Sequence, residues 1–218
     1  MQKFALLFLA FLAACHSAEA QLIPLPPELK AFLMRPEQQQ GFIGSMARQW
    51  HTIIPNCASP QVKSTNVFID SSPTFDQAGV PTSGAWHVAS QVEGCGEIRT
   101  ITVFYFFAKD GEMKRITGLP GTTIADSTLQ RDALPYAIMS MAGIAPKNCN
   151  STLFTNTRFV GFEQTSPQAT PGPIKRAWTE EWTVWSCGVT GIVAVHFTPD
   201  ATGTGITSIM NETRRVNP

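Results

Sequence analysis

A few side chains in this sequence carry groups that catalysis or metal binding requires, but their spacing matches no common active-site motif. Three histidines follow residue 20, at His51, His87 and His196. The chain has no G-x-S-x-G, S-x-x-K or H-E-x-x-H motif, no C-x-x-C pair and no glycine-rich phosphate loop. We therefore predict no catalytic residue, no metal site and no cofactor.

The histidines are interpreted as structural. His51 follows a predicted helix, where a cation is favourable beside the helix C-terminus. His87 and His196 fall on predicted strands, and we expect each histidine to be solitary on the surface or buried among apolar side chains. The competing hypothesis is a hydrolase of the cell envelope, whose polar residues would converge in the fold. Its candidates are His87, Glu93, Glu181 and His196.

The predicted strand 178–185 holds two carboxylates and two unpaired tryptophans. Glu180 and Glu181 are adjacent, so on a strand they point to opposite faces and cannot flank one substrate; both are expected to be solvated. Trp182 and Trp185 are three residues apart and also face opposite sides, one inward and one outward. An exposed tryptophan beside Glu and Thr suits a sugar or peptide surface, so these two are the candidate partner-binding residues.

The elements that must position these residues are repeated once, at an offset of 92 residues. Twelve positions between Asn56 and Gly111 are identical to the residue 92 positions later, without any gap. They include Trp86 and Trp178, which we predict to be core residues. Because the shared positions are cysteines, tryptophan, glycines and strand-forming residues, the repeat describes a scaffold rather than an active site.

Four cysteines follow residue 20, and the repeat selects one of their three pairings. Each copy has two cysteines 38 residues apart, which predicts the disulfides Cys57–Cys95 and Cys149–Cys187. A loop of that length stabilises the fold by about 4 kcal/mol in the chain-entropy model. An even number of cysteines without metal-ligand spacing also indicates an oxidising compartment.

Each copy is predicted to form a helix, a strand, a long loop and a three-stranded meander. In the first copy these are helix 37–50, strand 62–69, loop 70–84 and strands 86–93 and 101–107, with a turn at 110–111 before the last strand. In the second they are helix 128–141, strand 153–162, loop 163–173 and strands 178–185 and 192–197. Ser127 and Gln130 form a predicted capping box. The two long loops are the expected contact surfaces.

The chain is expected to be exported from a bacterial cell. Residues 1–20 have a positive start and an apolar run of eleven residues, which is a signal peptide and is too short to span a bilayer. The A-x-A sequence at 18–20 predicts cleavage before Gln21. The sequence LAAC at 12–15 resembles the lipobox of bacterial lipoproteins, in which Cys15 would carry a lipid anchor. The protein is then periplasmic or secreted, or alternatively anchored to the membrane through Cys15.

Charge and hydropathy exclude two classes of partner. The net charge is zero, 15% of residues are charged and no run of Lys or Arg is present, so nucleic acid is not an expected partner. No further apolar segment has membrane-spanning length.

Strand 101–107 has apolar side chains on both faces, which predicts cover by the helix on one side and by the second copy on the other.

The sequence thus predicts an α+β fold made of two tandem homologous repeats, each a helix packed on a short antiparallel β-sheet with one disulfide, related by a pseudo-twofold axis. The expected organisation is signal peptide 1–20, N-terminal segment 21–35, repeat 1 at 36–126 and repeat 2 at 127–218. The working hypothesis for function is a non-catalytic binding module that contacts an envelope protein or glycan.

Overall fold

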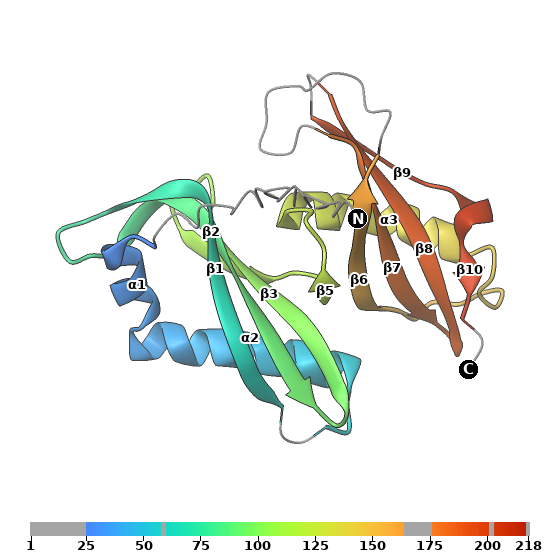
Figure 1. The fold of residues 1–218 in the computed structure, drawn as a ribbon, viewed down its shortest axis with the longest axis horizontal. Coiled ribbons are helices and arrows are strands. Elements are labelled where there is room, and N and C mark those ends of the chain that lie inside the picture. Colours follow the sequence, from blue (N-terminus) through green and yellow to red (C-terminus); the bar gives the residue numbers. More distant parts are fainter. Residues whose placement is uncertain (1–24, 58–59, 164–175, 201–202, 217–218) are drawn as a thin grey trace, which may run out of the picture.

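The computed structural model describes residues 25–57, 60–163, 176–200 and 203–216. Within them the chain forms an α+β fold with three α-helices and two β-sheets (Figure 1). The predicted signal peptide, Cys15 and all but the first residue of loop 163–173 lie outside the described residues. No helix in the described part of the chain is long and apolar enough to cross a membrane.

The order of elements agrees with the predicted alternation of helices and strands. The first half contains α1 (Pro27–Leu33), α2 (Pro36–Ile53), β1 (Gln61–Phe75), β2 (Pro81–Gly94), β3 (Glu97–Phe107), β4 (Met113–Thr117) and β5 (Gly121–Thr122). The second half contains α3 (Ser127–Met141), β6 (Thr152–Phe162), β7 (Trp178–Ser186), β8 (Val189–Pro199), β9 (Thr204–Ser208), the 3-10 turn η1 (Met210–Glu212) and β10 (Arg214–Arg215).

The strands form two sheets. Sheet A has the antiparallel order β1-β2-β3-β4. Sheet B has the order β10-β8-β7-β6-β5, and β9 also pairs with β8. The short strand β5 is part of the segment that connects the halves, and it pairs parallel with β6, Gly121 opposite Thr157. The connection is therefore built into sheet B rather than being a free turn.

Proline and acidic residues fix the helix starts, as helix-capping chemistry requires. Pro27 and Pro36 occupy first-turn positions, where a missing N–H costs nothing. At α3 the cap is Asp126, whose side chain accepts hydrogen bonds from the N–H groups of Thr128 (2.8 Å) and Leu129 (2.9 Å). The predicted Ser127 capping box is therefore wrong by one residue, because the aspartate carboxylate is the acceptor here.

The predicted loop 70–84 is mostly strand. Strand β1 continues to Phe75 and β2 begins at Pro81, so only the turn between them is irregular. The prolines that suggested a loop are tolerated because β1 is an edge strand, and its register with β2 shifts on both sides of Ser71 and at Thr74. The first half therefore has a long two-stranded arm in place of a recognition loop.

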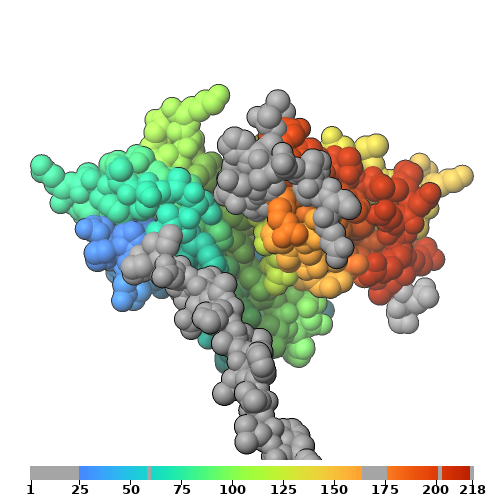
Figure 2. Space-filling model, turned by 45° about the horizontal axis from the view of Figure 1, so that its top comes forward, coloured from blue at the N-terminus to red at the C-terminus, as the bar shows by residue number. Residues whose placement is uncertain are grey.

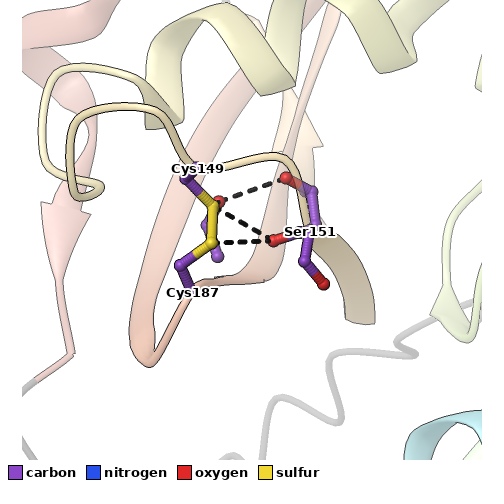
Figure 3. The surroundings of a disulfide bond; sticks show 5 residues. Cys149, Ser151 and Cys187 are labelled. Atoms are coloured by element: carbon purple, nitrogen blue, oxygen red, sulfur yellow. Dashed lines mark hydrogen bonds between the residues drawn. A yellow bond between two sulfur atoms is a disulfide. The ribbon is translucent and has the colours of Figure 1, made fainter.

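Both predicted disulfides are formed. Cys57 joins Cys95 and Cys149 joins Cys187, each with 5.8 Å between Cα atoms. Cys95 and Cys187 have positive φ angles and each precedes a glycine with positive φ, which is the backbone that a two-residue hairpin turn with the strand twist requires. In the second half the Ser151 carbonyl lies 3.2 Å from Cys149 Sγ (Figure 3). The disulfides thus tie the β2–β3 hairpin turn to the segment before β1, and the β7–β8 hairpin turn to the segment before β6.

The core lies between each sheet and its helices. Trp86 and Trp178 are fully buried, as predicted, and each stacks on an aromatic ring of the next strand, Tyr105 and Phe197 respectively. Strand β3 is buried on both faces, also as predicted. One face contacts the helices, while Phe104 on the other face lies against Gly118, which lies between β4 and β5.

Candidate functional site

The outer face of sheet A, which points away from α1 and α2, carries a paired histidine. His87 on β2 places Nδ1 2.9 and 3.0 Å from the two carboxylate oxygens of Asp70 on β1. Because a carboxylate accepts, Nδ1 carries the proton, and Nε2 has no hydrogen-bond partner among the described residues. The expectation of a solitary or apolar-buried histidine is wrong at this position.

An aromatic row crosses the three strands at the same level. Phe68 stacks on the His87 ring with centroids 4.8 Å apart and planes at 17°, and Phe104 lies on the other side at 5.4 Å and 44°. The antiparallel register sets this row, since Phe68 pairs with His87 and His87 with Phe104. The imidazole is therefore fixed by rings on two sides and by a carboxylate at Nδ1.

The connecting segment 121–126 lies over this face and closes a cleft. A cavity of about 390 Å³ is lined on one side by the aromatic row, Asp70 and Thr102, and on the other by residues 121–126. A second cavity of about 490 Å³ adjoins it and shares the lining residues Asp70, Phe104 and Asp126. Both volumes fall in the range of about 300–1,000 Å³ that is typical of small-molecule sites.

A buried carboxylate in sheet B holds the connecting segment in place. Glu180 is fully buried, and its Oε1 accepts hydrogen bonds from the N–H groups of Ile124 (3.0 Å) and Ala125 (3.3 Å). The indole N–H of Trp178 (3.1 Å) donates to the same oxygen, and that of Trp182 (2.9 Å) to Oε2. The prediction that Glu180 is solvated is wrong, because its carboxylate replaces water as acceptor for four buried donors.

At the other end of the connecting segment, the backbone of β5 approaches β6 too closely for any side chain. Gly121 has a φ of +115°, and a Cβ there would lie 2.0 Å from the carbonyl oxygen of Thr157. Thr157 donates from its backbone N–H (2.6 Å) and its hydroxyl (2.9 Å) to the Pro120 carbonyl. The connecting segment is therefore bound to sheet B at two places, by β5 at one end and by Ile124 and Ala125 near the other.

The outer face of sheet B carries a different constellation around His196. Its Nδ1 lies 3.2 Å from Glu163 and 3.0 Å from the Thr179 hydroxyl, and its Nε2 lies 2.7 Å from Glu212. Burial lowers the pKa of His196, but the hydrogen bonds and charges of Glu212 and Glu163 outweigh this and raise it above its usual value. The imidazolium form, which donates from both nitrogens, links β8 to η1. The expectation of a solitary or apolar-buried histidine is therefore wrong at His196 as well.

The remaining candidates are dispersed over the molecule. Glu93 forms an ion pair with Lys63 at 3.0 Å, and Glu181 contacts Arg158 and Arg214. The hydrogen bond from Arg214 leads the interactions that lower the pKa of Glu181.

The four residues named for a hydrolase therefore do not converge: His87 is paired with Asp70, and Glu93, Glu181 and His196 each have other partners. His51 lies exposed in the last turn of α2.

The two tryptophans named as partner-binding residues separate as the strand alternation predicts. Trp182 is fully buried and donates to Glu180, so its ring is not on the surface. Trp185 is 36% exposed on the outer face of sheet B, and it lines neither compartment of the cleft. Within the described residues no group of three or more His, Cys, Asp or Glu has the arrangement of a metal site.

Sequence reasoning missed Asp70, Phe68 and the connecting segment. The signal that would have found the first two is the strand register, since His87 faces Phe68 and lies beside Asp70 only once β1 is aligned with β2. No family model, curated protein or solved structure matches this chain. The functional argument therefore rests on the geometry of the cleft.

Proposed function

We propose that this chain is a non-catalytic binding module of the bacterial cell envelope, and that it holds an envelope protein or glycan in the cleft over sheet A. The observation that carries the proposal is a preformed cavity whose walls combine aromatic rings, a His–Asp pair and hydroxyl groups. Such sites, mostly apolar with a few fixed polar groups, are typical of specific recognition. The cleft includes Asp70 from the predicted contact loop 70–84, while residues 164–173 of the second predicted loop lie outside the described residues.

Capture from envelope extract tests this function with a matched pair of variants. Phe68 and Phe162 are exposed to similar extents, 44% and 42%, but only Phe68 lines the cleft. Immobilised wild-type protein and the Phe162→Ala variant are expected to retain the same envelope component, and Phe68→Ala is expected to lose it. Equal retention by all three proteins, or no retained component, would count against the proposal.

A specific observation favours one alternative, an envelope hydrolase. His87 lines the cleft and has the arrangement of a general base, because Asp70 fixes Nδ1 while Nε2 has no hydrogen-bond partner among the described residues. In this alternative Nε2 would accept a proton from a water molecule attacking a cell-wall bond. If this alternative holds, the wild-type protein releases soluble fragments from purified peptidoglycan and His87→Ala does not. If no fragments appear, the binding function remains.

We further propose that the halves 36–126 and 127–218 are copies of one duplicated unit, related by a pseudo-twofold axis. The support is the 92-residue offset, which relates Glu97–Phe107 (β3) to Val189–Pro199 (β8) without a gap, together with disulfides of equal sequence separation, 38 residues. An experimental structure in which β1–β4 do not superpose on β6–β9 would contradict the duplication.

The proposed location is outside the cytoplasm, after removal of a signal peptide. The two disulfides are consistent with an oxidising compartment. Mass spectrometry of the mature N-terminus separates the two forms of export: a chain starting at Gln21 is periplasmic or secreted, whereas a diacylated or triacylated Cys15 identifies a membrane-anchored lipoprotein. An unprocessed Met1 in the exported fraction would contradict both.

A further inference from the structure

We infer that the cleft binds a neutral saccharide, with the apolar face of one pyranose ring packed against the exposed ring of Phe68. This inference rests on the proposed binding function and names the class of its ligand. Four properties of the cleft support it: an exposed aromatic ring, a rim of hydroxyl groups, no Lys or Arg among the described residues around His87, and a fixed shape.

The exposed ring of Phe68 matches the apolar side of a sugar ring. The Phe68 and His87 rings are stacked face to face, with their planes at 17°, so Phe68 forms the end of the stack on the edge strand β1 and remains 44% exposed. One face of a pyranose consists mainly of C–H groups, which are apolar and pack on an aromatic surface, while the hydroxyl groups point outward around the ring. Covering the exposed ring with such a surface is favourable because both apolar surfaces leave water.

The rim of the cavity supplies hydrogen bonds for the hydroxyl groups. Thr100 and Thr102 line it from β3, and Thr122 and Thr123 from the connecting segment. His87 Nε2 adds a further group that has no partner among the described residues, since Nδ1 is held by Asp70. Hydroxyl groups that both donate and accept are the natural complement of a sugar, whose hydroxyl groups do the same.

The charges of the cleft favour an uncharged ligand. Asp70 is hydrogen-bonded to His87, and Asp126 uses Oδ1 to cap α3. No Lys or Arg is among the described residues that line the cavity around His87; Arg131 lines only the adjoining compartment. A phosphate or carboxylate beside Phe68 would therefore meet two aspartates and no arginine or lysine, which disfavours an anionic ligand.

The size and rigidity of the cleft indicate more than one sugar unit. Its compartments of about 390 and 490 Å³ meet at Asp70, Phe104 and Asp126, so a linear oligosaccharide would extend from one into the other. Glu180 fixes the connecting segment above the first compartment through Ile124 and Ala125. A wall held in advance reduces the ordering cost of binding a flexible polyol.

Isothermal titration calorimetry of the mature protein tests the inference with defined probes. The panel is a β-1,4-linked N-acetylglucosamine trisaccharide, the neutral trisaccharides of glucose, the matching monosaccharides and glucose 6-phosphate. We expect at least one neutral trisaccharide to bind more tightly than its monosaccharide, and the phosphorylated sugar to show no binding. Loss of the ring in Phe68→Ala is expected to weaken binding about tenfold, with Phe68→Leu as a variant that keeps apolar volume without the ring.

Phe162→Ala is the control, and it should bind as the wild type does because Phe162 lies outside the cleft. The inference is overturned if no neutral saccharide binds at millimolar concentration, or if Phe68→Ala and Phe162→Ala bind equally. It is also overturned if envelope capture depends on Phe68 but no saccharide competes for it. In that last case the binding function stands and the ligand is a protein surface.

Discussion

The outer faces of the two sheets, which belong to the two halves that lie side by side in Figure 2, carry different side chains. On sheet A the central positions are aromatic, with His87 between two phenylalanine rings. On sheet B the face is ionic, with Glu181 between Arg158 and Arg214 and with His196 between two carboxylates. Because both sheets have antiparallel strands at their centre, the difference lies in the outward side chains rather than in the strand arrangement.

The inner faces differ at several positions, and one of these differences changes the hydrogen bonding of the core. Val88 of β2 corresponds by the 92-residue offset to Glu180 of β7. Among the described residues the buried indole N–H of Trp86 has no hydrogen-bond partner, whereas Trp178 donates to Glu180. The carboxylate thus accepts from the tryptophans of its own core and also binds the connecting segment. Glu180 therefore links sheet B to the segment that closes the cleft over sheet A.

Replacing Glu180 by the valine of the first half should have the largest effect on stability. Glu180→Val removes the acceptor of two indole and two backbone N–H groups, all of them in the interior or at the connecting segment. Buried donors without partners cost about 1–3 kcal/mol each, so the loss of an acceptor for four donors is expected to lower the free energy of unfolding by about 4 kcal/mol or more. Urea unfolding followed by tryptophan fluorescence measures this change.

The neighbouring Glu181→Gln is the control for this substitution. Glu181 lies on the outer face, where ion pairs contribute about 1 kcal/mol or less, so its loss should be small. Equal losses of unfolding free energy for Glu180→Val and Glu181→Gln would show that the hydrogen bonds of the buried Glu180 carboxylate do not stabilise the core and the connecting segment.

A methyl group on Gly121 should disturb the connecting segment without touching sheet A. Gly121→Ala combines a left-handed backbone with overlap against the Thr157 carbonyl, and we expect a loss of about 2 kcal/mol or more. Gly161→Ala is the matched control in β6, because a Cβ there meets no atom within 4 Å. Thermal unfolding should separate the two variants, and equal midpoints would contradict the close approach of β5 to β6.

The ionic face of sheet B predicts a small pH dependence of the free energy of unfolding. Because the pKa of His196 is raised in the folded state, its contribution is fully present below the unfolded value of about 6.5 and is lost as the pH rises through the folded pKa. With about a quarter of the side chain exposed (23%), the contribution is about 1 kcal/mol or less. The unfolding free energy should decline above neutral pH, and His196→Gln should remove that decline.

Glu181 provides an internal check, since its titration falls in a different range. The pKa of Glu181 is lowered, so its contribution is present above the unfolded carboxylate value and is lost as the pH falls through the folded one. The decrease in the free energy of unfolding at acid pH should therefore still be seen in His196→Gln. Loss of both decreases, at acid pH and above neutral pH, in that variant would contradict the assignment.

Local patterns in the sequence were sufficient to predict the disulfides and the strand faces, but they were insufficient to predict the residues that form the cleft. The repeat selected Cys57–Cys95 and Cys149–Cys187, because two cysteines at the same offset leave one economical pairing. Strand alternation correctly separated Trp182 from Trp185. The burial of Glu180 was missed although Trp178 and Trp182 flank it on the same face, because alternation gives the direction of a side chain and not its hydrogen-bond donors.

The His87–Asp70 pair was missed for a different reason. Its residues belong to different strands and are 17 positions apart, so their contact depends on the register between β1 and β2 and on the bulge after Ile69. Pro73 made that stretch resemble a loop, and the edge position that tolerates a proline is a property of the finished sheet. Long-range register is therefore the part of the site that the sequence alone does not supply.

The central claim is that ligands are recognised at the outer face of sheet A and not at that of sheet B. The histidine ring resonances test it most directly, because His87 lies in the cleft, His196 on sheet B and His51 at the end of α2. Ring spectra are recorded while solubilised cell-wall fragments are added to the mature protein. The account predicts that the His87 signals shift and saturate while those of His51 and His196 stay in place; movement of His196 with His87 unchanged would contradict it.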